Sequence, residues 1–168
     1  MMMPAPPLDL APARVLPEWI DYNGHMNVAY YSLAFDRALD DFCDRHDLGQ
    51  AYVRRTGRSI FVLEAHVTYL HEVKVHDPLH FTFQLLDCDE KRFHFFLGMV
   101  HGEEGYLAAT SEQIALHVNL QARRAEPFAA ATAKALATLA TSHRALKPPA
   151  QAGHVIAIRP RPDGVAPR

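Results

Sequence analysis

The segment Asp21-Tyr22-Asn23-Gly24-His25-Met26-Asn27 combines residues that can do chemistry with residues that can position them. Asp21 supplies a carboxylate that can act as a base or a nucleophile. Gly24 permits a close bend, and Asn27 is a good N-cap for a helix that follows directly. The N–H groups at such a helix start carry a partial positive charge, which suits a developing oxyanion. We therefore predict a site here, in which His25 orients Asp21 or the substrate.

The alternative is a purely structural role for this segment, as a tight turn followed by a helix cap, because Asp, Asn and Gly are common in turns. Asn27 serves in either interpretation, as a cap, as a site residue, or as both. Beyond it, apolar residues recur every three to four positions from Val28 to Leu48 and predict a long helix that Gly49 ends. This helix is apolar over more than half of its circumference, so other elements must wrap around it.

The rest of the chain supplies those elements as predicted strands joined by short turns. A short strand at 13–16 precedes the motif, and a helical turn at 50–56 follows the long helix. Four longer strands are predicted at 59–73, 79–86, 92–101 and 106–118, and a C-terminal helix at 127–146. In the first of these four, the odd positions Phe61, Leu63, Ala65, Val67 and Tyr69 form an apolar face. Strands linked by two to five residues should be antiparallel neighbours.

The chain divides into a flexible N-terminus at 1–12, one domain at 13–146 and a proline-rich tail at 147–168, where residues 154–158 could add a short strand. With 168 residues, there is room for one domain with a substantial core. The net charge of -2 argues against nucleic-acid or anionic-membrane binding. No apolar run reaches the roughly 18 to 20 residues of a membrane span, and we find no secretory signal.

Cysteine and histidine usage predicts neither a disulfide framework nor a metal centre. Cys43 and Cys88 have no metal or redox spacing, so we expect reduced thiols and a cytoplasmic location. Among the eleven histidines, those at 66, 71, 76 and 80 follow a strand and a turn and need not converge. We therefore predict chemistry without a metal or any other cofactor.

The order of a short strand, a motif loop, a buried helix and four antiparallel strands resembles the hotdog fold. This is an α+β fold in which a curved antiparallel sheet of about five strands wraps a long central helix. The motif at 21–27, followed by Tyr30 and Tyr31, looks like the signature of acyl-CoA thioesterases related to 4-hydroxybenzoyl-CoA thioesterase. That family places an aspartate three residues before the motif glycine, and Asp21 matches this position. The resemblance covers about residues 13–120.

Later segments are similar to thioesterases of carnitine breakdown, which hydrolyse betainyl-CoA. These are Ser59, Glu64-Ala65-His66, the stretch 89–94 and Leu116-His117-Val118. The resemblance implies hydrolysis of a short or polar acyl-CoA, with betainyl-CoA as the sharpest expectation, and coenzyme A bound only as part of the substrate. The alternatives are a thioesterase for long-chain acyl groups on coenzyme A or acyl carrier protein, and a non-catalytic acyl-CoA-binding protein of the same fold.

The resemblance also implies a homodimer or homotetramer, in which subunits join at the edge of the 59–73 strand and the sites lie at the interface. Glu64 would then reach a site containing the partner's Asp21, and Glu64 and His66 would bind substrate together with Gly24 and Tyr30. A carboxylate with aromatic rings, drawn from Trp19, Tyr22, Tyr30 or Tyr31, would suit a trimethylammonium group. The phosphates of coenzyme A have seven basic candidates, Arg54, Arg55, Arg58, Lys91, Arg92, Arg123 and Arg124.

Overall fold

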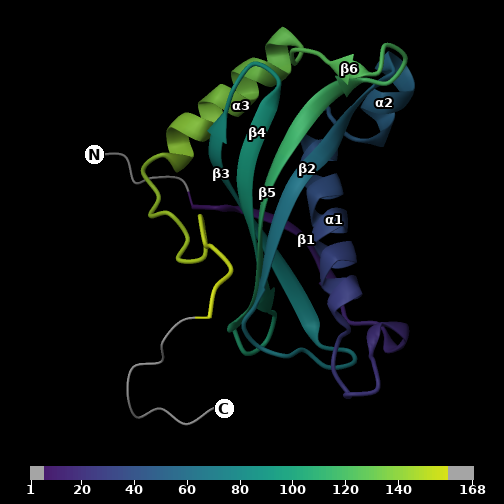
Figure 1. Cartoon of the computed structure of the whole chain (residues 1–168), viewed down its shortest axis with the longest axis vertical. Helices are drawn as coiled ribbons and strands as arrows, with labels where there is room; N and C mark the ends of the chain where they lie inside the picture. Colours follow the sequence, from purple (N-terminus) through teal and green to yellow (C-terminus); the bar gives the residue numbers. More distant parts are fainter. Residues whose placement is uncertain (1–5, 159–168) are drawn as a thin grey trace.

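The computed structural model describes residues 6–158, in which a curved antiparallel sheet lies against a long helix (Figure 1). The strands run in the order β1-β3-β4-β5-β2, and a short β6 pairs with β5. This confirms the predicted α+β arrangement. The strands are β1 (Leu8–Arg14), β2 (Arg58–Tyr69), β3 (Pro78–Cys88), β4 (Arg92–His101), β5 (Leu107–Asn119) and β6 (Arg124–Ala125). The helices are α1 (Val28–Arg45), α2 (Gln50–Thr56), α3 (Ala130–His143) and the 3-10 turn Pro17–Trp19.

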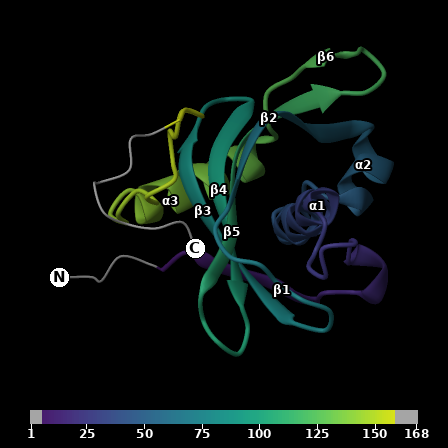
Figure 2. The same cartoon turned by 60° about the horizontal axis from the view of Figure 1, so that its bottom comes forward.

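The core lies between α1 and the concave face of the sheet, which Figure 2 shows curving around one side of the helix. Phe42 of α1 is fully buried and stacks on Phe83 of β3, with ring centroids 3.8 Å apart. Phe93 and Phe95 continue this aromatic layer across β4. Burial of such rings is the main stabilising contribution to a domain of this size. The packing holds α1, and therefore the motif at its start, in a fixed position on the sheet.

The ends of α1 follow from local residue chemistry. Asn27 caps the helix, since its side chain accepts a hydrogen bond from the N–H of Ala29. The helix ends at Arg45, earlier than the predicted Leu48, because Asp47 adopts a left-handed conformation with φ of 54°. Leu48 then folds back, and its N–H donates to the carbonyl of Cys43. The second helix occupies the predicted residues 50–56.

Several predicted boundaries are wrong at the two ends of the chain. The first strand runs over Leu8–Arg14, so residues 8–12 belong to the sheet and not to a flexible N-terminus, and the predicted strand at 13–16 is shifted. Strand β6 was not predicted, and α3 is shorter than 127–146. Residues 154–158 form no strand in the described chain. The rest of the predicted N-terminus and tail, at 1–5 and 159–168, lies outside the described residues.

Strand β2 carries a bulge that the alternating pattern did not reveal. It ends at Tyr69 rather than Val73, and its register with β5 shifts between Val62 and Glu64. Ile60 and Val67 both pack against the core, although residues seven apart on a regular strand face opposite sides. The extra residue exchanges the two faces of the strand. The prediction that all the odd-numbered apolar residues of this strand form one face toward the core is therefore wrong. Phe61 and Leu63 are 51% and 56% exposed in the chain.

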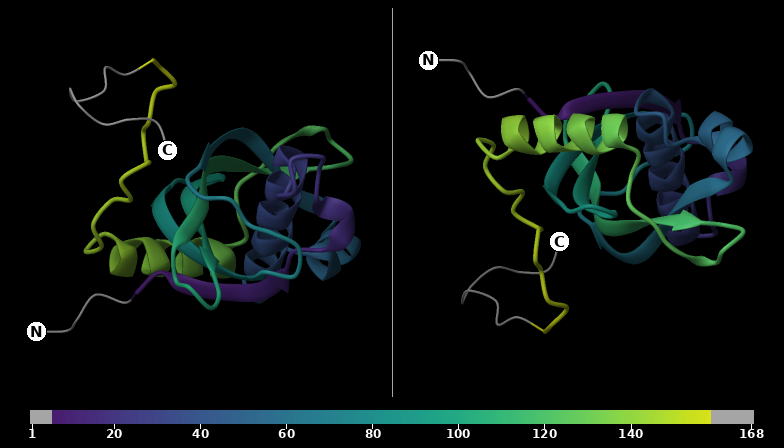
Figure 3. Two further views of the ribbon diagram at one scale, coloured as in Figure 1. Left: turned by 90° about the horizontal axis from the view of Figure 1, so that it is seen from below. Right: turned by 90° about the horizontal axis from the view of Figure 1, so that it is seen from above.

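Helix α3 lies on the β3 and β4 side of the molecule, apart from α1 (Figure 3). Its last residue, His143, is buried, and its ring Nδ1 accepts a 2.9 Å hydrogen bond from the N–H of Leu85. Burial lowers the pKa of His143, so the ring is held in its neutral form. A neutral imidazole thus anchors the C-terminal helix to β3.

Candidate active site

Two donors from its own loop hold the Asp21 carboxylate. One oxygen accepts from the N–H of Asn23 at 2.8 Å, and the other accepts from the side-chain amide of Asn27 at 3.3 Å. The turn between them depends on Gly24, which has φ of 82° and donates its N–H to the carbonyl of Asp21. The carboxylate is therefore oriented by hydrogen bonds but remains partly exposed.

Asn27 performs more than one task at the start of α1. Its side-chain oxygen accepts from Ala29 N–H at 3.0 Å, its side-chain nitrogen donates to Asp21, and its backbone N–H donates to the carbonyl of Trp19. The predicted cap is confirmed. The same side chain also ties Asp21 to the helix, so that capping and positioning are joined in one residue.

A cavity of about 290 Å³ opens beside Asp21. The loop forms one wall, and the end of β2 with the segment after it forms the other, because Met26 N–H donates to the carbonyl of Val73 at 2.9 Å. No local pattern in the sequence predicts this second wall, since the contact joins residues that are far apart in the chain. The lining residues are Asp21, His25, Met26, Val28, Tyr31, Tyr69, Leu70, His71 and Glu72.

His25 faces Glu72 across this cavity. The His25 Nε2 atom lies 3.7 Å from a carboxylate oxygen of Glu72, and Nδ1 lies 3.4 Å from the carbonyl of Met26. Within residues 6–158, no hydrogen bond joins His25 to the Asp21 carboxylate, which Asn27 contacts instead. His25 therefore lines the cavity wall, while Asn27 is the residue whose side chain contacts the Asp21 carboxylate.

The backbone N–H groups near the helix start are partly committed. Those of Gly24, Met26 and Asn27 donate to carbonyls of the chain. Within the described part of the chain, the N–H groups of His25 and Val28 have no such acceptor, and both residues line the cavity. They lie at the positive end of the 18-residue helix α1, where an acyl oxygen gains most from hydrogen bonding.

The two tyrosines after the motif have different surroundings. Tyr31 is buried at the cavity wall, and burial is the main cause of its raised pKa, so its hydroxyl stays protonated. Tyr30, which the sequence suggested as a substrate contact, instead stacks on Trp19 with ring centroids 5.7 Å apart. Trp19 itself is only 2% exposed. Of this pair of tyrosines, Tyr31 therefore lines the cavity beside Asp21.

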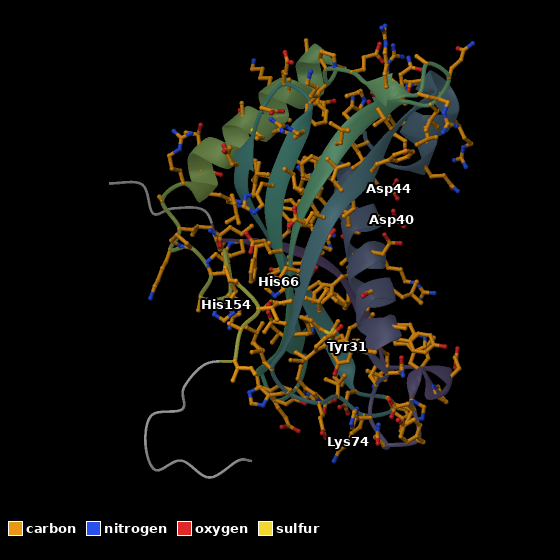
Figure 4. The ribbon with its side chains drawn as sticks, viewed as in Figure 1. Tyr31, Asp40, Asp44, His66, Lys74 and His154 are labelled. Carbon is orange, nitrogen blue, oxygen red and sulfur yellow. The ribbon has the colours of Figure 1, made fainter. Side chains whose placement is uncertain are left out.

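Glu64 and His66 lie elsewhere in the same chain. They line a separate cavity of about 350 Å³ together with His94, Glu112 and His154. Figure 4 shows His66 beside His154, whereas Tyr31 belongs to α1 on the other side of β2. One chain therefore does not bring Glu64 or His66 to its own Asp21. Their role at the site of a partner subunit stays a prediction.

The basic residues considered for coenzyme A are mostly engaged in ion pairs. Arg55 pairs with Asp47, Arg58 with Glu126, and Arg92 with Asp89. Lys74, which is not one of the seven candidates, borders a neighbouring cavity that shares Leu70, His71 and Glu72 with the first. In residues 6–158, no cluster of three His, Cys, Asp or Glu residues is placed to hold a metal ion, and no helix is long and apolar enough to cross a membrane.

Comparison with known proteins gives the class to which this fold and site belong. Residues 15–136 match the thioesterase-like superfamily. The chain belongs to this superfamily, and the predicted thioester hydrolase is confirmed.

Two curated relatives sharpen this result. A betainyl-CoA thioesterase of Pseudomonas aeruginosa is 40% identical over 146 residues, which cover 87% of this chain and 92% of the relative. An L-carnitine dehydrogenase/betainyl-CoA thioesterase of Rhizobium meliloti is 37% identical over 88% of this chain, but this match spans only 29% of that longer protein. The similarity found in the segments at 59–66, 89–94 and 116–118 therefore extends over most of the chain.

Solved structures agree with the fold. A Staphylococcus aureus protein solved in complex with CoA has a TM-score of 0.86 and 31% identity, covering 95% of this chain and 99% of its own. A putative thioesterase of Pseudomonas putida has a TM-score of 0.79 and 33% identity, covering 93% and 99%. A 1,4-dihydroxy-2-naphthoyl-CoA thioesterase of Synechocystis, at 14% identity and TM-score 0.69 over 78% and 97%, shares the fold. The hotdog prediction is thereby confirmed.

Proposed function

We propose that this thioesterase hydrolyses a short, polar acyl-CoA, and that betainyl-CoA is its substrate. The observation that carries the proposal is the 40% identity to a betainyl-CoA thioesterase, which extends over 87% of one chain and 92% of the other. The cavity of about 290 Å³ beside Asp21 suits a short acyl group better than a long one.

In the proposed reaction, Asp21 acts as a general base or as the nucleophile. As a base, it takes a proton from water while the water oxygen adds to the thioester carbonyl carbon. As a nucleophile, it forms an anhydride that water then cleaves. In either case the N–H groups of His25 and Val28 receive the carbonyl oxygen as it gains charge. Collapse of the intermediate breaks the carbon–sulfur bond and releases the coenzyme A thiolate.

The proposed assembly is a homodimer, or a tetramer built from such dimers, formed through the free edge of β2. This strand pairs only with β5 among the described strands, and its exposed residues include Phe61, Val62 and Leu63. An unpaired edge that exposes apolar side chains is a typical place for a second chain to add. In such an assembly, Glu64 and His66 of one subunit would lie near the interface.

We further propose that the enzyme works in the cytoplasm without a metal or other cofactor. Cys43 and Cys88 are both free thiols, which fits a reducing compartment. The proposed acid–base and oxyanion groups all belong to the chain itself. Exhaustive chelation should therefore leave thioester hydrolysis intact, and a loss that added metal restores would overturn this part of the proposal.

The test is thiol release from betainyl-CoA, short and long fatty acyl-CoAs and aromatic acyl-CoAs, run beside Asp21→Ala. We expect the highest kcat/KM with betainyl-CoA and a loss of at least about a hundredfold in the variant. Preference for a long acyl chain would overturn the substrate, and wild-type turnover by Asp21→Ala would overturn the catalytic residue. Tight acyl-CoA binding without any turnover would favour a binding protein.

A further inference from the structure

The cavity beside Asp21 has the composition of a cation site. Two carboxylates, Asp21 and Glu72, line it, and no lysine or arginine is among its described lining residues. Two rings, those of Tyr31 and Tyr69, form another part of the wall and meet edge to face with centroids 5.1 Å apart. Aromatic faces combined with a carboxylate attract quaternary ammonium groups.

The chemistry of the proposed substrate determines where its cation must lie. In a betainyl thioester, one methylene separates the carbonyl carbon from the quaternary nitrogen, so these atoms are about 2.5 Å apart, as the N and C atoms of one residue are. A carbonyl within reach of Asp21 therefore places the trimethylammonium group in the same cavity. A carboxylate in a distant cavity of the same chain is therefore too far away to bind the trimethylammonium group.

The other groups considered from the sequence do not meet this condition within one chain. Glu64 lines the cavity on the far side of the sheet, with His94 and Glu112. Trp19 and Tyr30 stack on each other, and neither of them lines the cavity beside Asp21. Tyr22 is 97% exposed and does not line it either. Tyr31, Tyr69 and Glu72 remain.

We infer that Glu72, with the rings of Tyr31 and Tyr69, binds the trimethylammonium group and determines the preference for a cationic acyl group. This inference rests on the proposed function. A carboxylate oxygen of Glu72 lies 3.7 Å from His25 Nε2 at the cavity wall, and the Glu72 side chain is 68% exposed, so the carboxylate is accessible to a ligand in the cavity. Tyr31 and Tyr69 supply the apolar, polarisable surface against which the methyl groups pack.

A pair of substrates that differ only in charge gives a direct test. Replacing the quaternary nitrogen of betainyl-CoA by carbon gives 3,3-dimethylbutanoyl-CoA, which has the same shape and no cation. The measured quantity is the ratio of kcat/KM for the two thioesters, since this ratio cancels effects on the shared chemical step. We expect wild type to prefer betainyl-CoA, and Glu72→Gln to lower the ratio about tenfold.

Two matched variants define the specificity of the effect. Glu103→Gln removes a carboxylate from the exposed turn between β4 and β5, and we expect it to leave the ratio at the wild-type value. Glu64→Gln removes the carboxylate of the other cavity. A ratio that stays at the wild-type value in Glu72→Gln, or that falls only in Glu64→Gln, would overturn the assignment to Glu72. Circular dichroism checks that each variant is folded, as expected for changes at exposed side chains.

The outcomes also separate this inference from the proposed function. If wild type hydrolyses betainyl-CoA and its neutral analogue equally well, the cation site is wrong while the thioesterase remains. If wild type hydrolyses neither but cleaves another acyl-CoA, the proposed substrate itself is wrong, and the inference falls with it. A charge preference that Glu72→Gln removes supports both.

Discussion

The side-chain amide of Asn27 donates to the Asp21 carboxylate at 3.3 Å, while the amide oxygen caps α1 through the N–H of Ala29. One rigid planar group thus links the proposed catalytic carboxylate to the start of the central helix. Since α1 is packed against the sheet through buried aromatic rings, the position of Asp21 depends on the whole core.

Substitutions of Asn27 should separate capping from positioning. Asn27→Ser keeps a good capping oxygen but lacks the amide donor, so we expect kcat to fall about tenfold with little change in stability. Asn27→Ala loses both tasks, and we expect a further cost of about 1 kcal/mol in the free energy of unfolding. The measurements are steady-state kinetics and urea unfolding. A serine variant with wild-type kcat would show that the contact with Asp21 has no catalytic role.

The open edge of β2 should control the oligomeric state. Leu63 is 56% exposed at the bulge of this strand, and Leu63→Lys places a charge where a second chain is proposed to pair. We expect size-exclusion chromatography with light scattering to show a dimer or tetramer for wild type and a monomer for the variant. Val155→Lys, at a side chain 74% exposed in the tail, is the control. Dimers that persist in Leu63→Lys would contradict this interface.

His143 should make the stability of the protein depend on pH. Burial lowers its pKa in the folded state below the ordinary 6.5, so the unfolded chain binds the proton more tightly. The resulting stability is present above pH 6.5 and is lost as the pH falls through the lower, folded value.

The variant His143→Gln cannot titrate, so its free energy of unfolding should change less than that of wild type between about pH 7 and pH 5. Urea unfolding at a series of pH values measures this. His80→Gln, at an exposed histidine, should retain the wild-type pH dependence. Equal pH profiles for wild type and His143→Gln would refute the role of the buried imidazole.

The two thiols should differ in reactivity. Cys43 is 4% exposed, and burial raises its pKa to about 12, so the reactive thiolate is scarce in the folded protein. Cys88 is only half-buried, although its pKa is raised as well. We expect iodoacetamide at about pH 8 to label Cys88 before Cys43 in the native protein, and both in urea. Mass spectrometry of the labelled peptides reads the result, and rapid native labelling of Cys43 would be the contrary outcome.

Local signals in the sequence located the helix cap, the turns and most strands, because these depend on neighbouring residues. The cap at Asn27 and the helix at 50–56 follow directly from residue chemistry. The first strand was misplaced because β1 gains its stability from pairing with β3, which is distant in the chain. The bulge between Val62 and Glu64 was invisible for a similar reason, since an alternating pattern does not record an extra residue.

The residues of the candidate site also include some that a local sequence pattern predicts and others that only a long-range contact brings in. Asp21, His25 and Asn27 lie in one loop, so the sequence could group them. Glu72 joins them only because Met26 pairs with Val73 and brings in the chain segment after β2, a contact without a local signal. Glu64 was instead predicted from the resemblance, which implies a subunit interface along this strand, and within one chain Glu64 lines a different cavity from Asp21.

Because of the bulge in β2, the shape of the site depends on the number of residues in this strand as well as on their types. Loss of a single residue near Leu63 would restore regular alternation and turn every following side chain to the opposite face. Val67 and Tyr69 would leave the helix side, and the cavity beside Asp21 would lose one of its aromatic walls. Relatives that differ by one residue in this strand should therefore differ in acyl specificity even when the motif before the helix is identical.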